Sequence, residues 1–177
     1  MKTTHFGIVT AALILSFSVA CKKEKTETPK ATGVVFCKVN GTYWECGQPN
    51  KTVNVDGKNY YMNYATIAND KLTISGIRKD TDTSGIYFYD VQLKSGWVGT
   101  VNGTTDAYTG GMYMKRYDID NLINVLGNYN VVYEISITSK DVTNKTISGN
   151  FIINMTSKTG SGNVTVSEGE FINLKYK

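Results

Sequence analysis

The sequence predicts an all-β fold, an antiparallel β-sandwich, with a lipocalin-like β-barrel as the alternative. Two prolines, seventeen glycines and twelve tyrosines, with many Thr, Asn, Val and Ile residues, are typical of strands joined by tight turns. From residue 33 onward, apolar and polar residues alternate with the period of strands that bury one face. Spacing alone leaves open the number of strands and the choice between a sandwich and a barrel.

The first half of the chain divides at polar turns. Asn-Gly at residues 40–41 predicts a hairpin between strands at 34–39 and 42–46. Further turns at 56–57 and 69–70 precede an alternating strand at 71–77. Alternation over residues 86–93 then places four side chains on one face: Tyr87, Tyr89, Val91 and Leu93. The glycine- and threonine-rich segment 96–111 is expected to hold short strands and loops.

One short helix is predicted over residues 118–126, where apolar residues recur at helical spacing. Asp118 can cap its start, and Gly127 can end it. After the helix, three alternating segments predict a meander: residues 131–137, 147–155 and 164–176. Gly169 lies between two glutamates in the last segment, which predicts a β-bulge there.

The N-terminal segment resembles a bacterial lipoprotein signal peptide. Residues 6–20 carry no charge but are short of the ~20 residues that a membrane-spanning helix needs. The small residues 18–20 precede Cys21, as in a lipobox, although leucine is commoner than Ser18 at its position. An ordinary secretory signal with an incidental cysteine is the alternative. We therefore expect residues 1–20 to be removed and Cys21 to carry acyl chains such as palmitate.

This processing predicts the organisation and location of the mature protein. Residues 21–32 lack large apolar side chains and are expected to form a flexible tether before a single β domain at 33–177. Two or more acyl chains hold a protein stably on a bilayer. The expected partner is therefore a membrane, reached through the lipid on Cys21. The expected location is the outer membrane of the cell envelope, facing the periplasm or the cell surface.

Composition excludes several function classes. Removal of residues 1–20 takes away the only histidine, His5, so the mature chain has no Ser-His-Asp or Cys-His site and no His-ligated metal. It also takes away Lys2, which leaves 18 basic and 15 acidic side chains, a balance that does not indicate a nucleic-acid partner. We expect no cofactor and no enzyme activity. Two carboxylate pairs, residues 118/120 and 168/170, keep a glycan-active enzyme as an alternative.

Cys37 and Cys46 flank the first hairpin turn. In the predicted register Cys37 lies opposite Trp44, and Cys46 lies diagonally on the same face. The expected compartment is oxidising, so the sequence favours a disulfide between these cysteines over two free buried thiols. A diagonal pair is at the long edge of what a disulfide spans, so a bulge or a longer turn would help it to form.

Three segments resemble small Bacteroidota lipoproteins of unknown function. They are Phe-Cys-Lys-Val-Asn-Gly-Thr-Tyr-Trp at residues 36–44, Ile-Ser-Gly-Asn-Phe at 147–151, and residues 164–171. The likeness spans most of residues 34–176 and implies a β-rich lipoprotein domain. In such relatives the positions of Cys37 and Cys46 tend to hold small residues, commonly alanine, so two cysteines here add to the case for a disulfide. The resemblance implies no catalytic or binding residue.

Residues 80–85 match the first half of a calcium loop. Asp80, Asp82 and Ser84 place oxygen atoms at alternate positions before a glycine. The position of the closing glutamate is Val91, so we expect no metal, and a polar hairpin turn is the plainer interpretation.

Aromatic residues provide candidate ligand contacts, of which Trp97, Tyr61 and Tyr108 are the best placed. Exposed Tyr and Trp side chains stack on sugar rings or anchor protein partners. The consecutive aromatic residues 87–89 must point to opposite faces of a strand, so one face lies outside or under a second layer.

The sequence therefore predicts a noncatalytic envelope lipoprotein with a binding or structural role, which presents loops to a glycan or protein partner. A lipocalin-like carrier of a small apolar ligand is the second hypothesis. A pocket of sufficient size would favour the carrier, and a filled core would exclude it.

Overall fold

The computed structural model describes residues 34–47, 51–55, 57–79, 83–115, 122–160 and 162–177. These residues form twelve strands and one short helix, arranged as sheets of six, four and two strands. The calcium candidates Asp80 and Asp82 lie outside the described residues, as do Cys21 and the expected tether. No helix in the described ranges is long and apolar enough to cross a membrane.

The six-stranded antiparallel sheet contains the predicted hairpin and the predicted meander. Its strands, in spatial order, are β2 (Thr42–Glu45), β1 (Val35–Val39), β12 (Val164–Lys175), β11 (Thr146–Ser157), β10 (Tyr129–Asp141) and β8 (Gly99–Thr104). Asn40 and Gly41 have φ values of 48° and 80°. A tight two-residue hairpin turn of type I′ needs positive φ at both of its central residues, so these values agree with the predicted turn. The predicted β-bulge is also present, because β12 gains an extra residue between Val166 and Gly169 opposite β11.

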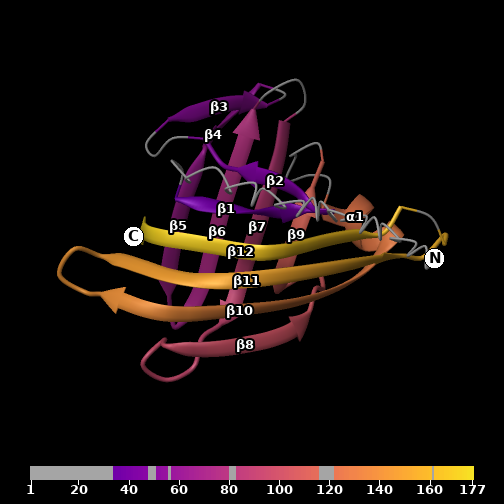
Figure 1. Cartoon of the computed structure of the whole chain (residues 1–177). Helices are drawn as coiled ribbons and strands as arrows, with labels where there is room; N and C mark the ends of the chain where they lie inside the picture. The colour runs from indigo at the N-terminus through magenta and orange to yellow at the C-terminus, as the bar shows by residue number, and fades with distance from the viewer. Residues whose placement is uncertain (1–33, 48–50, 56, 80–82, 116–121, 161) are drawn as a thin grey trace, which may run out of the picture.

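The four-stranded antiparallel sheet packs against the six-stranded one. Its order is β5 (Asn63–Ala68), β6 (Lys71–Lys79), β7 (Thr83–Gln92) and β9 (Gly110–Met114). The strands of one sheet cross those of the other in Figure 1, and the sheets do not close into a barrel. The fold is therefore the predicted antiparallel β-sandwich, and the lipocalin-like barrel is not found.

The main core fills the space between the two sheets. Phe88 in β7 makes edge-to-face contacts with Tyr133 in β10 and Phe151 in β11, at ring-centroid distances of 6.0 and 5.4 Å. Aliphatic residues from both sheets surround these rings, among them Leu72 and Ile135. The interior of the sandwich is thus packed with side chains, and it leaves no lipocalin-like central cavity in the described part of the chain.

A second apolar cluster covers the outer face of the four-stranded sheet. Tyr87 and Tyr89 stack there with ring centroids 5.4 Å apart, beside Met112 and Met114. The hairpin of β3 (Thr52–Val55) and β4 (Lys58–Tyr61) supplies Val53 to this cluster. Phe88 therefore faces the main core while its two tyrosine neighbours face the second layer, as consecutive aromatics in a strand require.

The predicted face of residues 86–93 is wrong in one respect. Tyr87 and Tyr89 belong to the second cluster, but Val91 and Leu93 belong to the main core. The register shifts between these pairs, because β7 has one more residue than β6 at this point, and Asp90 has a φ of 49°. A one-residue bulge exchanges the faces of all side chains that follow it.

Helix α1 spans Leu122–Asn128 and leads directly into β10. Gly127 lies inside the helix, which ends at Asn128, two residues later than predicted. The predicted cap, Asp118, lies outside the described residues. Val125 contacts both apolar clusters, so the helix packs against the end of the sandwich.

Candidate functional site

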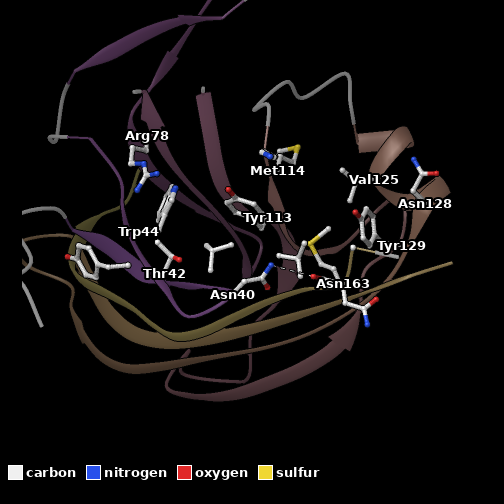
Figure 2. Close-up of a pocket in the computed structure, with 16 residues that line it drawn as sticks. Asn40, Thr42, Trp44, Arg78, Tyr113, Met114, Val125, Asn128, Tyr129 and Asn163 are labelled. Carbon is white, nitrogen blue, oxygen red and sulfur yellow. Dashed lines mark hydrogen bonds between the residues drawn. The ribbon is translucent and has the colours of Figure 1, made fainter. Parts of the chain in front are cut away.

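An open cleft of about 690 Å³ lies at the α1 end of the sandwich (Figure 2). Its lining residues come from both sheets and from α1, with contributions from the β1–β2 turn, β6, β9, β10, β11 and the start of β12. Small-molecule sites commonly have volumes of about 300–1,000 Å³. The cleft is therefore large enough for a small ligand.

Trp44 forms one wall of the cleft and connects the two sheets. It is only 2% exposed, and its indole Nε1–H donates a hydrogen bond of 2.9 Å to Oγ of Ser84 in β7. Ser84 is itself only 4% exposed, and its hydroxyl oxygen is the acceptor that satisfies the buried indole N–H of Trp44. The third calcium candidate is therefore buried between the sheets, and no metal-binding group of acidic, His or Cys side chains exists among the residues described.

Arg78 lies at the same end of the cleft as Trp44 (Figure 2). Along β6, Ile74 faces the main core, and a Cβ atom added at Gly76 would lie 3.2 Å from Val35 in the opposite sheet. Because side chains alternate along a strand, Arg78 points to the same side, into the space between the sheets. It is half-buried there, and its Nε atom is fully covered.

Apolar and aromatic side chains form the opposite part of the lining. Tyr113 in β9 and Tyr129 at the start of β10 are both half-buried, so part of each ring is covered and part is accessible. Val125, Met155 and Val164 extend this surface from three different elements. Such a surface is suited to a flat or ring-shaped apolar group.

Two asparagines hold the polar edge of the cleft in place. The Asn40 side-chain amide donates to the carbonyl oxygen of Asn163 at 3.4 Å, and its Oδ1 accepts from the backbone N–H of Thr165 at 2.8 Å. Oδ1 of Asn163 accepts from the backbone N–H of Ser157 at 2.9 Å. The hairpin turn, in which Asn40 has a positive φ, therefore also places the Asn40 side-chain amide at the edge of the cleft.

The charged side chains of the described lining are Arg78 and Lys115, both cationic. Tyr43 also lines the cleft, and partial burial with a 2.8 Å hydrogen bond to Glu45 raises its pKa to about 12. The phenol is therefore neutral at physiological pH. The lining offers positive charge, amide groups and aromatic rings to a ligand.

Cys37 and Cys46 are free, buried thiols in the structure, which corrects the predicted disulfide. Cys37 pairs with Trp44, so Cys46 occupies a diagonal position beyond the end of β2. Diagonal neighbours lie about 7–8 Å apart, which exceeds the usual Cα separation of a disulfide. Burial raises the pKa of both thiols, that of Cys37 to about 12.

Trp97, a predicted ligand contact, is held in a packed corner away from the cleft. Its Nε1–H donates to Oδ1 of Asp70 at 2.9 Å, its ring lies 5.5 Å edge-on from Tyr176, and Nζ of Lys140 lies 5.3 Å from its centroid. Trp97 thus fixes the segment between β7 and β8 against the C-terminal end of the chain.

Tyr61 and Tyr108, the other predicted contacts, are 48% and 82% exposed. They lie on different elements, Tyr61 in β4 with Lys177 5.2 Å from its ring, and Tyr108 between β8 and β9. Of the carboxylate pairs, Glu168 binds Lys38 at 2.8 Å, while residues 118 and 120 lie outside the described residues. Among the candidates that the structure describes, Tyr61, Tyr108 and Glu168 lie on separate elements and do not form one site.

Sequence reasoning did not identify the cleft, nor three of its lining residues: Arg78, Tyr113 and Tyr129. One signal existed for Arg78, because it continues the alternation of Leu72, Ile74 and Gly76 as a cation at a core-facing position. Charged side chains are rarely buried in a core unless they are paired, so a cation at such a position is noteworthy.

No family model matches the chain, and no curated protein or solved structure matches it significantly.

Proposed function

We propose that this chain is a lipid-anchored, noncatalytic binding protein of the outer membrane, whose cleft receives a small ligand. The observation that carries the proposal is the cleft itself, which is open, preformed and lined by accessible aromatic rings, amides and cations. Small-ligand sites combine a mainly apolar wall with a few convergent polar groups in this way.

The sequence supports the anchored setting. Small residues precede Cys21 after an uncharged segment, and the lipid on Cys21 would hold the domain at the membrane through residues 21–32. The resemblance of residues 34–176 to small Bacteroidota lipoproteins agrees with this setting. A binding role suits a mature chain without histidine, because recognition of shape and charge needs no reactive side chain.

The proposal differs from both binding hypotheses that the sequence raised. The packed interior and the open sheets exclude a lipocalin-like carrier, but the cleft provides a pocket outside that interior, at the end of the sandwich. The loop-presentation hypothesis needed clustered exposed aromatics, but Tyr61 and Tyr108 lie on separate elements and Trp97 is packed. A small ligand in the cleft is therefore favoured over a glycan or protein bound by these loops.

A fluorescence titration with N-phenylnaphthylamine, a neutral aromatic probe, tests the cleft as a binding site. We expect saturable binding of one probe molecule to the full mature lipoprotein in detergent micelles, above the binding to micelles alone. Thr42 lines the cleft, so Thr42→Trp should occupy part of it and weaken binding roughly tenfold or more if it displaces one ring of the probe, since burial of a ring is worth about 1.5–3 kcal/mol. Thr165→Trp, at an exposed position of β12, is the matched control.

Two results would contradict the proposal. The probe would show no binding above that to micelles, or Thr42→Trp and Thr165→Trp would leave the affinity equally unchanged. In the second case the probe would bind outside the cleft.

A further inference from the structure

We infer that the cleft selects ligands that carry an acidic group beside a flat apolar body, and that Arg78 binds the acidic group. This inference rests on the proposed function, because it names the chemical class of the ligand for the same cleft. It is carried by the position of one guanidinium between two β-sheets and by the charge of the lining around it.

The backbone fixes the direction of Arg78. It lies near the end of β6, paired with Ser84 of β7, and it continues the row of inward-facing residues Ile74 and Gly76. Ser84 itself is bonded to Trp44 of the opposite sheet. Arg78 therefore emerges beside a hydrogen bond that holds the two sheets together, and the packing limits how far its stem can move.

A half-buried guanidinium favours an anion over a neutral ligand for two reasons. Electrostatic attraction is stronger where protein replaces water, and a neutral ligand that covered the cation would remove water without returning charge. The planar fork of N–H donors also matches the two oxygens of a carboxylate, sulfonate or phosphate. Arg78 makes a contact within the protein as well, but five N–H donors allow it to bind a ligand in addition.

The rest of the described lining agrees with this charge. Lys115 adds a second cation, and the lining residues in the described ranges include no Asp or Glu. Tyr113 lies in Figure 2 between the Arg78 end and the Tyr129 end of the cleft, so an apolar body can extend along both rings from an acidic group at Arg78. Charge and shape together indicate an amphipathic anion of small size.

Two probes that differ in one acidic group test this inference on the full mature lipoprotein. Anilinonaphthalene sulfonate is an anion, and N-phenylnaphthylamine has the same ring system without the sulfonate. We expect the anion to bind about tenfold more tightly, because only the sulfonate can accept charge-assisted hydrogen bonds from the guanidinium. Arg78→Gln should abolish that preference while leaving the affinity for the neutral probe within about threefold of the wild-type value.

Lys79→Gln is the matched control, because it removes the same charge from the neighbouring residue of β6, whose exposed side chain points to the other face. It should leave the preference unchanged. Arg78→Lys keeps the charge without the fork and should retain part of the preference. This variant decides the case in which Arg78→Gln loses both probes: a retained preference supports the inference, and a lost one overturns it.

Equal affinities of the wild-type protein for the two probes would overturn the inference while the proposed function stands. An equal loss of preference in Arg78→Gln and Lys79→Gln would also overturn it, because the effect would then come from net charge. Failure of both probes to bind the wild-type cleft would instead contradict the proposed function.

Discussion

Trp44 donates the hydrogen bond of its indole across the sandwich to Ser84, and both side chains are almost fully buried. The indole N–H has no access to water at this position. The Ser84 hydroxyl is therefore important for stability, because a buried donor without an acceptor carries its full desolvation cost.

Ser84→Ala should lower the free energy of unfolding by about 1–3 kcal/mol, because it leaves the Trp44 N–H buried without an acceptor. Urea unfolding measured by circular dichroism checks this value. Ser167→Ala, at a half-buried position of β12, is the control and should change the stability by less than about 0.5 kcal/mol. Equal stability of both variants would show that the hydrogen bond is not formed in solution.

Ionisation of Cys37 should lower the free energy of unfolding at alkaline pH. Burial raises the pKa of its thiol from 9.0 to about 12, so the folded chain holds this proton more tightly than the unfolded chain. The contribution is fully present below pH 9.0, and it is lost as the pH rises from there toward about 12. The raised pKa of Tyr89, also about 12 and also caused mainly by burial, acts in the same direction.

We therefore expect the free energy of unfolding to fall between about pH 8 and about pH 10.5, and to fall less in Cys37→Ala than in the parent chain. Urea titrations at the two pH values, under reducing conditions, give the comparison. Parallel losses in both chains would mean that the thiol does not contribute. The same samples can be alkylated without reductant, and two modified cysteines after unfolding would agree with free Cys37 and Cys46.

At the scale of elements, two glycines differ in the space around them: one lies in close packing and the other at an open surface. Gly169 lies in the bulge of β12, where an added Cβ would lie 2.5 Å from both the ring and the carbonyl oxygen of Phe151. Gly127 lies in α1, where an added Cβ would meet nothing within 4 Å. The same substitution should therefore have opposite effects at these two glycines.

Gly169→Ala should destabilise the chain by about 1–3 kcal/mol, because β12 must shift away from β11. Gly127→Ala should stabilise it by about 0.5–1 kcal/mol, because alanine loses less backbone entropy in a helix. Thermal unfolding of both variants measures the two changes. A neutral Gly169→Ala would indicate that the bulge can relax without cost.

The strands and turns could be predicted because their signals are local. Asn40-Gly41 specifies its hairpin through positive φ angles, and residues 131–137 and 147–155 alternate with the period that a half-buried sheet requires. The bulge at Asp90 has no comparable local signal, so the faces of Val91 and Leu93 were assigned wrongly. Which strands share a sheet, and how the two sheets cross, depends on contacts between distant strands, which alternation does not encode.

The cleft was hidden for the same reason at the scale of the whole molecule. Its residues come from strands of both sheets and from α1, and they meet only when the sheets cross (Figure 1). Arg78 carried the one readable signal, a cation at an inward position of β6. The aromatic residues that composition emphasised mostly serve the two apolar clusters or, in Trp97, a packed corner.

The anchor is the other property of the whole molecule. In a bacterial host that processes lipoproteins, the chain should fractionate with membranes and begin at an acylated Cys21, because two or more acyl chains give stable attachment. Cys21→Ser should remove the acyl mass and the membrane association. Mass spectrometry of the purified N-terminus checks this, and an unmodified wild-type chain released into the medium would refute it.

The account depends most on the claim that the cleft at the α1 end of the sandwich binds an acidic, ring-bearing ligand. A crystal structure of the mature chain grown with anilinonaphthalene sulfonate tests it most directly. We predict the sulfonate at the guanidinium of Arg78 and the rings against Tyr113. A cleft filled by the protein's own side chains, or a probe bound only elsewhere, would contradict the account.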